Sequence, residues 1–333
     1  MKAWVSHEAG DPSTLVLEET RIPEPRGDEV LVRVQAVGVN FPDGLFIRDL
    51  YQIKPPRPFV PGSEFCGVVE KTGANATHLK RGDVVVGASG WGAMSEYVAL
   101  PEDRLFRIPD DLPREEAAAF LFTYATAYHA LHDSGRLSAG ETLVVLGAAG
   151  GVGSAAVGVG KALGATVIAS ASTQAKIDFA VGCGATDGLV YDVDLPTGDG
   201  QRELTRQLKA LAPAAGVDVV LDPVGGPYTE PALRSLARGG RHLVVGFAAG
   251  IPRVPLNIAL LRSCHIIGVD WRTFIQEERA ANEKNMEVLF ALWRSRQIQP
   301  QVTELFPFEA APTAIARLDE RQAMGKIVVS LLA

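Results

Sequence analysis

The sequence has few cysteines and no clustered positive charge. Its 333 residues include only three cysteines, Cys66, Cys183 and Cys264, and none of them belongs to a C-x-x-C motif. Scattered thiols of this kind are usually reduced and buried, so we expect neither disulfides nor a cysteine-based zinc site. The formal net charge is -7, without any basic block. Phosphate backbones are bound by clustered Lys and Arg, so a nucleic-acid partner is not expected.

Long apolar runs are also missing. No stretch approaches the roughly 20 apolar residues that span a bilayer, and the N-terminal MKAWVSHEAG lacks the apolar core of a signal peptide. We therefore expect a cytoplasmic protein without a membrane partner. Hydrophobic residues make up 47% of the chain, and its length exceeds that of one ordinary core, which predicts two domains.

The pattern of the chain changes near residue 115. Before it, Val-rich segments such as EVLVRVQAVGVN (29–40) alternate with glycine-marked turns and predict a barrel-like β domain. A helix is expected over 114–135, and after it strands and helices alternate, which predicts a parallel sheet covered by helices on both faces. The expected strands are 144–146, 166–170, 188–191, 217–222 and 241–246; the expected helices are 151–163, 175–181, 202–212 and 228–235, with a later helix over 277–295 and a final strand in GKIVVSLL.

The segment VVLGAAGGVGS resembles a dinucleotide-binding loop between a strand and a helix. Gly150 and Gly153 take the second and third glycine positions of G-x-G-x-x-G, and Ala148 takes the first. Small residues let the backbone approach a pyrophosphate, whose charge then lies at the helix N-terminus. A tight turn without a ligand is the alternative interpretation. The alternating elements around the loop favour nucleotide binding.

The cofactor type is indicated by the residues after the next strand. A carboxylate there would bind the ribose of NAD, but ASASTQAK (169–176) contains no acid. Its hydroxyls at Ser170, Ser172 and Thr173, with the cation of Lys176, suit the 2′-phosphate of NADPH instead. An exposed, solvated lysine is the alternative for Lys176.

With these residues in view, the chain resembles the medium-chain dehydrogenase/reductase superfamily, in its zinc-free, zeta-crystallin-like NADPH:quinone oxidoreductase branch. The resemblance rests on VGVNFPDGLF, PFVPGSEFCGVVEKTG, KRGDVVVG, TYATAYHALHDSGRLSAGETLVVLGAAGGVG and DERQAMGKIVV. It implies an α/β fold with a GroES-like catalytic domain (1–121 and 269–333) and a Rossmann domain that binds NADPH (122–268). It also implies a homodimer.

The same resemblance assigns roles to single residues. Tyr191 could instead cover the core and Thr126 could serve helix packing. The implied cofactor-binding residues are Gly150, Gly151, Val152 and Gly153 for the phosphates, Ser172, Lys176 and Tyr191 for the 2′-phosphate end, Asn40 and Thr126 near the nicotinamide, and Phe247 and Arg321 elsewhere along the cofactor.

No metal is expected, because the zinc ligands of related alcohol dehydrogenases are missing. Asn40 stands at the position of a zinc-binding Cys and Ser63 at that of a His, and no Cys occurs over 122–125. The four close cysteines of a structural zinc site are absent too. His129 and His132 are interpreted as packing or helix-surface residues. Without a Lewis acid, a plain ketone is hard to polarise.

A quinone accepts hydride readily, so its site needs an apolar slot and one or two hydrogen-bond donors. Asn40 and Asp43 are the catalytic candidates, with ordinary turn chemistry as the alternative. Related quinone reductases often carry Tyr where Leu45 stands, and Tyr51 could line the site instead. Two other functions stay open: NADPH-dependent reduction of an activated C=C bond (a 2-alkenal, enone or acryloyl/enoyl thioester), which benefits from a placed proton donor, and NADPH binding without catalysis.

Overall fold

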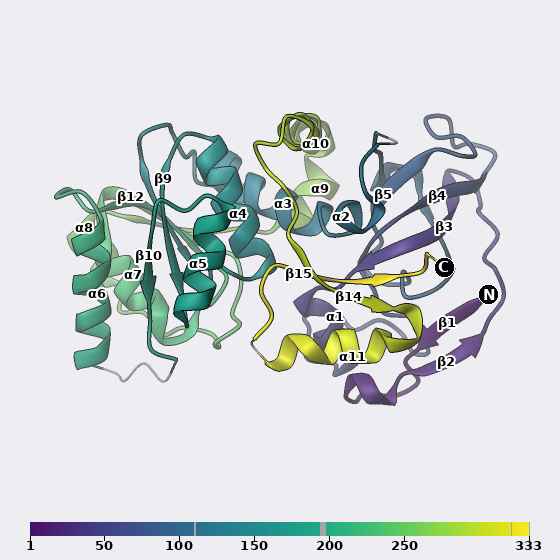
Figure 1. Cartoon of the computed structure of the whole chain (residues 1–333), viewed down its shortest axis with the longest axis horizontal. Helices are drawn as coiled ribbons and strands as arrows, with labels where there is room; N and C mark the ends of the chain where they lie inside the picture. The colour runs from purple at the N-terminus through teal and green to yellow at the C-terminus, as the bar shows by residue number, and fades with distance from the viewer. Residues whose placement is uncertain (110, 194–197, 321, 333) are drawn as a thin grey trace. The chain divides into compact units, whose positions relative to one another are not determined.

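The computed structural model describes residues 1–109, 111–193, 198–320 and 322–332, and its contacts define two compact units (Figure 1). Unit 1 consists of Met1–Phe122 and Pro300–Ala333, and unit 2 of Thr123–Gln299. Within the described ranges, no helix is both long enough and apolar enough to cross a membrane.

Unit 1 is built on a mixed seven-stranded sheet in the order β14-β15-β3-β4-β5-β7, with β6 paired to β3, and on the separate hairpin β1-β2. All of these pairs are antiparallel except β14–β15, which is parallel. The strands are β1 (Lys2–Val5), β2 (Val16–Glu19), β3 (Glu29–Gly38), β4 (Glu64–Thr72), β5 (Val84–Ala88), β6 (Tyr97–Pro101), β7 (Leu105–Arg107), β14 (Val302–Pro307) and β15 (Lys326–Ser330); the helices are α1 (Phe41–Ile47), α2 (Arg114–Ala118) and α11 (Ala311–Ala316).

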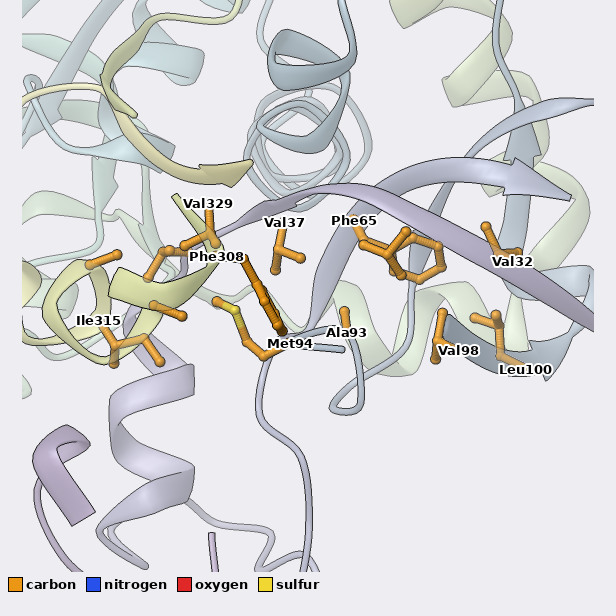
Figure 2. Packing of buried hydrophobic residues seen from close by; sticks show 14 of the residues in the cluster. Val32, Val37, Phe65, Ala93, Met94, Val98, Leu100, Phe308, Ile315 and Val329 are labelled. Atoms are coloured by element: carbon orange, nitrogen blue, oxygen red, sulfur yellow. The ribbon is translucent and has the colours of Figure 1, made fainter. Parts of the chain in front are cut away.

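The core of unit 1 joins residues from both ends of the chain. Figure 2 shows it, with Val37 of β3, Phe65 of β4, Met94 and the C-terminal Phe308 among its buried members. Because β15 pairs antiparallel with β3, with Val328 opposite Gly38, the start of β15 lies beside the end of β3. This pairing brings a C-terminal segment to the turn that contains Asn40.

Unit 2 contains a six-stranded, all-parallel sheet in the order β10-β9-β8-β11-β12-β13. Numbered within the unit, this is the order 3-2-1-4-5-6 of a Rossmann fold, so the predicted α/β class and parallel sheet are confirmed. The strands are β8 (Thr142–Leu146), β9 (Thr166–Ala171), β10 (Asp187–Val190), β11 (Val217–Asp222), β12 (Leu236–Val244) and β13 (His265–Gly268); the helices are α3 (Leu121–Tyr128), α4 (Gly151–Ala162), α5 (Gln174–Cys183), α6 (Asp199–Leu211), α7 (Thr229–Ser235), α8 (Asn257–Arg262), α9 (Trp271–Glu277) and α10 (Arg279–Arg294).

Helices cover both faces of this sheet. Figure 1 shows α4 and α5 on one face and α6 and α7 on the other. Between the second pair and the sheet lies a core that includes Leu208 of α6, Leu233 of α7 and Val220 of β11. Covering on both faces explains why the strands read as nearly continuous apolar runs.

Two sequence-based expectations differ from the structure. The single helix expected over 114–135 is interrupted: α2 ends at Ala118, α3 begins at Leu121, and a π-helical turn spans His129–Ser134. Continuation would pair the Phe122 N–H with the carbonyl of Ala118, but the buried Glu64 carboxylate accepts that N–H at 2.7 Å. The break is therefore stabilised by a residue from another strand.

The second difference concerns the C-terminal domain boundary. Residues 269–299, expected in the first domain, belong to unit 2. There the Phe274 ring stacks on His129 with ring centroids 4.0 Å apart, and Asn285 Nδ2 donates to Asp133 Oδ2 at 2.7 Å. The His129 ring is thus a packing group, and α9 and α10 are attached to the segment that follows α3.

Candidate active site

The glycine-rich loop lies at the carboxyl edge of the parallel sheet, between β8 and α4. Gly147 has φ +60°, a left-handed conformation that disfavours side chains. A Cβ at Gly153 would collide with the carbonyl of Gly147, whereas a Cβ at Gly150 would meet only that oxygen at 3.5 Å. Gly153 is therefore needed for the turn itself, and Gly150 leaves a surface that another molecule can approach. The strained position of the loop is Gly147, just before the expected first glycine.

Hydroxyl groups lie at the end of the next strand, β9, and just after it, and Lys176 lies in the first turn of α5. Lys176 Nζ donates to Ser172 Oγ at 3.1 Å, and partial burial lowers the pKa of this lysine. Thr173 caps α5 by accepting the Lys176 N–H at 3.3 Å, so its hydroxyl is engaged locally. Ser170 is fully buried, and its Oγ has no hydrogen-bond partner within the described part of the chain.

Tyr191 lies at the same edge, because Val190 pairs with Ala171 between the parallel strands β10 and β9. Its ring packs against Tyr228 with centroids 4.6 Å apart. The Tyr228 hydroxyl is 2.9 Å from the carbonyls of Asp192 and Val193. Burial raises the pKa of Tyr191 to about 12, so its phenol stays neutral and can donate a hydrogen bond.

Two further loops of this edge are held together by Asp222 at the end of β11. Its Oδ1 accepts from the N–H groups of Val224 and Gly225 at 2.9 and 2.7 Å, and its Oδ2 lies 3.1 Å from Nε2 of the buried His242. Burial raises the pKa of Asp222, but the bonds to His242 and to these donors outweigh it and hold the carboxylate ionised. The neighbouring loop contains the half-exposed Phe247, whose ring a Cβ at Gly225 would meet at 3.2 Å.

The remaining cofactor candidates are less informative. Thr126 is buried within α3, consistent with either role proposed for it. Gly151 and Val152 form the first turn of α4, where backbone N–H groups lack partners inside a helix. Arg321 lies outside the described residues.

Asn40 lies in unit 1, between β3 and α1, with both ends of its amide engaged. Nδ2 donates to the Gly38 carbonyl at 3.1 Å and to Glu64 Oε2 at 3.0 Å, while Oδ1 accepts from Lys326 Nζ at 2.7 Å. An amide has two N–H donors, and both donate to groups of unit 1. The side chain is therefore fixed in orientation.

Lys326 and Glu64 form a buried ion pair that the sequence analysis did not predict. Their side chains are 5% and 0% exposed, and Nζ lies 3.0 Å from Oε2. The ammonium also donates to the Val39 carbonyl at 3.0 Å. Buried charges are tolerated when paired and hydrogen-bonded, and this pair fixes Asn40. The sequence signal that could have revealed the ion pair is Lys326, a charged residue in the otherwise apolar KIVV stretch.

Asp43 lies one turn into α1 and is completely buried. Its Oδ2 accepts the Asn40 N–H at 2.8 Å. Burial raises the pKa of Asp43 to about 6, although the bond to Asn40, the nearby Ser63 hydroxyl and the charge of Lys326 act in the opposite direction. Neither Asp43 Oδ1 nor Ser63 Oγ forms a hydrogen bond of full geometry with any described residue. The two catalytic candidates thus belong to one buried cluster with Ser63, Glu64 and Lys326.

Comparison with known proteins identifies both units. The alcohol dehydrogenase GroES-like domain matches residues 26–110, and the zinc-binding dehydrogenase domain matches residues 151–286. Quinone oxidoreductase-like protein 2 of Rattus norvegicus is 34% identical over 99% of this chain and 96% of its own length. The chain belongs to the medium-chain dehydrogenase/reductase superfamily, in its quinone oxidoreductase branch.

Solved structures of this branch are similar along the whole chain. Escherichia coli quinone oxidoreductase complexed with NADPH has a TM-score of 0.89 and 29% identity, over 99% of this chain and 100% of that one. Quinone oxidoreductase from Thermus thermophilus, also studied as its NADPH complex, has a TM-score of 0.83 and 34% identity over 99% and 100% of the two chains. The predicted family and GroES-like plus Rossmann fold are therefore confirmed.

The second domain name implies zinc, and the residues of this chain do not fit that ion. At the two positions where zinc-dependent relatives are expected to supply ligands stand Asn40 and Ser63, and Asn40 Oδ1 already accepts from the cation of Lys326 at 2.7 Å. Over the described ranges, no group of three or more His, Cys, Asp or Glu side chains could hold a metal ion. No step of the chemistry below therefore involves zinc.

Proposed function

We propose that this protein is an NADPH-dependent oxidoreductase that transfers a hydride to a quinone. The observation that supports it most is the carboxyl edge of unit 2, where the glycine loop, the acid-free end of β9 and the Lys176–Ser172 pair meet. Relatives named quinone oxidoreductase have been crystallised with NADPH. Membership of the branch alone would leave the cofactor and the acceptor open.

The residues of unit 2 fit NADPH well. The N-terminus of α4 would hold the pyrophosphate, because its first N–H groups lack partners inside the helix and Gly150 leaves room for approach. Lys176 and Ser172 would bind the 2′-phosphate, and Tyr191 would donate beside it. The orphaned hydroxyl of Ser170 supports a polar ligand at this edge, since buried polar groups are normally hydrogen-bonded. Thr126 and Phe247 keep their proposed contacts with the cofactor, and the role of Arg321 stays a prediction from the resemblance.

When bound, NADPH supplies the hydride, and the chain supplies orientation and electrostatics. In this proposal Asn40 is a positioning residue, because Lys326 and Glu64 already fix its amide. Asp43 remains the catalytic candidate of unit 1. Tyr51, suggested as a substitute for the missing tyrosine at Leu45, packs on Phe46 with ring centroids 4.7 Å apart, which places it among the apolar residues of this unit.

The cofactor assignment is tested by Lys176→Ala, with the exposed Lys284→Ala of α10 as the matched control. We expect Lys176→Ala to weaken NADPH binding about tenfold or more and NADH binding little, because a charge-assisted contact to the 2′-phosphate contributes about 1.5–3 kcal/mol. Fluorescence titration measures both affinities. Equal losses for the two cofactors would remove the phosphate role of Lys176.

The acceptor is tested by following NADPH oxidation with 1,2- and 1,4-quinones beside 2-alkenals and enoyl thioesters. Quinone reduction is expected. Turnover of the alkenals or thioesters without quinone reduction would instead support the activated C=C reductase, which the buried carboxyl of Asp43 makes chemically reasonable. Tight NADPH binding without any turnover would support a non-catalytic binding protein.

We also propose that the active form is a homodimer joined through α8 and β13. Leu256, Leu260 and Leu261 on and beside α8 are 75–79% exposed, and β13 is an edge strand that pairs only with β12 among the described strands. A second copy of this chain would cover both features, since an open edge can pair with its own symmetry mate. Leu260→Glu should yield monomers in light scattering, whereas Leu50→Glu, 69% exposed in unit 1, should not. An unchanged mass for Leu260→Glu would refute this interface.

A further inference from the structure

Asp222 of unit 2 is a buried carboxylate with four hydrogen-bond donors around it. Its Oδ1 accepts from the N–H groups of Val224 and Gly225 at 2.9 and 2.7 Å. The hydroxyl of Thr229 donates to Oδ2 at 2.7 Å, and Nε2 of His242 lies 3.1 Å from the same oxygen. These bonds keep the carboxylate ionised, and an ionised carboxylate only accepts hydrogen bonds. Nε2 of His242 therefore carries a proton and donates it to Asp222.

The His242 ring uses its polarity at Asp222 alone. The residue is 0% exposed on β12, and its Nδ1 has no hydrogen-bond partner among the described residues. Burying a polar atom without a hydrogen bond is unfavourable, and an apolar ring of similar size would avoid that penalty. The bond to Asp222 is therefore the interaction that distinguishes histidine from an ordinary core residue at this position.

The Asp222 carboxylate fixes two loops at the carboxyl edge of the sheet, 223–226 after β11 and 245–250 after β12, which we call the loop pair. Its Oδ1 bonds hold the first loop directly, and two backbone hydrogen bonds join that loop to the second. A Cβ at Gly225 would lie only 2.6 Å from a carbonyl oxygen of the second loop, so the two backbones are in close contact. The joining bonds run from the Ala249 N–H to the Val224 carbonyl and from the Gly226 N–H to the Gly250 carbonyl, both at 2.7 Å.

The loop pair borders the glycine-rich loop. A Cβ at Gly147 would lie 2.8 Å from Cγ2 of Val224, so the loop after β11 packs against the turn between β8 and α4. Strands β8 and β11 are neighbours, and the strand order reverses between them. A dinucleotide binds across such a point with one mononucleotide on each half of the sheet. The half made of β8, β9 and β10 leads to the Lys176–Ser172 pair, which leaves the half of the loop pair for the nicotinamide.

We propose that His242 and Thr229 are positioning residues for NADPH, which act through Asp222 to hold the loop pair in the conformation that receives the nicotinamide half of the cofactor. The inference rests on the proposed function and deepens it. The three side chains belong to residues that are 0%, 3% and 2% exposed, so they act through the loops rather than by touching the ligand. All the contacts that support this role lie within unit 2.

His242→Phe removes the donor and keeps a flat ring, whereas His242→Gln supplies an amide N–H in its place. Isothermal titration calorimetry measures the affinity of each variant for NADPH and for adenosine 2′,5′-bisphosphate, which carries the 2′-phosphate half without nicotinamide. We expect His242→Phe to weaken NADPH binding about tenfold, the effect of losing a hydrogen bond to a charged group, and to leave bisphosphate binding within about twofold. His242→Gln should recover most of the NADPH affinity. Equal losses for both ligands, or an unchanged NADPH affinity, would overturn the positioning role.

Leu208→Ala is the matched control for stability. Leu208 is fully buried near the C-terminal end of α6, at the opposite edge of the same sheet, so its truncation leaves a cavity far from the loop pair. Both affinities should stay unchanged, and a selective loss of NADPH binding in this control would overturn the inference. Thr229→Val, which removes one hydroxyl from Asp222 with little change in volume, repeats the two titrations if His242→Phe does not fold.

Amide hydrogen exchange tests the loop pair without a ligand. The N–H groups of Val224, Gly225 and residues 245–250 should exchange about tenfold faster in His242→Phe than in the wild type, and at the wild-type rate in Leu208→Ala. If the wild-type protein does not bind NADPH, the proposed function fails and this inference fails with it. If the protein binds NADPH but the loop pair exchanges equally in the wild type and in His242→Phe, only the inference is overturned.

Discussion

The stability of unit 1 should depend on pH through Asp43, and Asp43→Asn isolates that dependence. Burial raises the pKa of this carboxyl from 3.8 to about 6, so the folded state binds the proton more tightly than the unfolded chain. The stability contributed by this protonation is fully present below pH 4 and is lost as the pH rises through 6. A pKa difference of this size corresponds to about 3 kcal/mol of unfolding free energy, which is lost by pH 7.5.

The assay is thermal or urea unfolding of the wild type and Asp43→Asn at intervals between pH 4 and pH 8. All other carboxylates titrate equally in both proteins, so the difference between their free energies of unfolding contains mainly Asp43. The variant should gain up to about 3 kcal/mol relative to the wild type across this range, with half of the change near the midpoint between the two pKa values. Asp28→Asn, which changes an exposed carboxyl of unit 1, should track the wild type throughout. A difference that stays constant with pH, or that falls as the pH rises, would refute the buried and reluctantly ionised state of Asp43.

Three further predictions follow from other parts of the structure. Gly153→Ala should abolish NADPH binding in a fluorescence titration, because its Cβ would collide with a loop carbonyl, whereas Gly182→Ala, with open space around it, should bind normally. Lys326→Met should lower the free energy of unfolding in urea by about 3–5 kcal/mol by stranding Glu64 as an unpaired buried charge, and adding Glu64→Gln should restore part of the loss. Cys66 is fully buried and its thiol pKa is raised by burial to about 12; mass spectrometry after iodoacetamide treatment should find it alkylated only in unfolded protein.

Unit 2 was predictable because its signals are local. Each parallel strand is a short apolar run followed by a turn and a helical period, so strands such as Val217–Asp222 are recovered from their own residues. The alternation also limits the order of the strands in the sheet, because crossovers between parallel strands are right-handed and few connections remain possible. Even here, Gly147 rather than the expected first glycine position carries the left-handed conformation, since the motif describes the ligand side of the loop and not its backbone angles.

The buried polar cluster of unit 1 could not be predicted in the same way. Lys326 and Glu64 are 262 positions apart in the chain, and only the antiparallel pairing of β15 with β3 and of β3 with β4 brings them together. The helical content of 114–135 likewise favoured one helix, because nothing nearby signals that Glu64 accepts the Phe122 N–H. Asn40 and Asp43 were found from a family motif, but the fixed orientation of Asn40 depends on these distant partners.

The charge of this cluster follows from its three titratable groups. Lys326 and Glu64 neutralise each other at 3.0 Å, so the cluster is neutral while Asp43 holds its proton and carries one negative charge after the proton leaves. Burial opposes that charge more than the Asn40 N–H at 2.8 Å and the nearby ammonium of Lys326 favour it, which is why the pKa of Asp43 is raised to about 6.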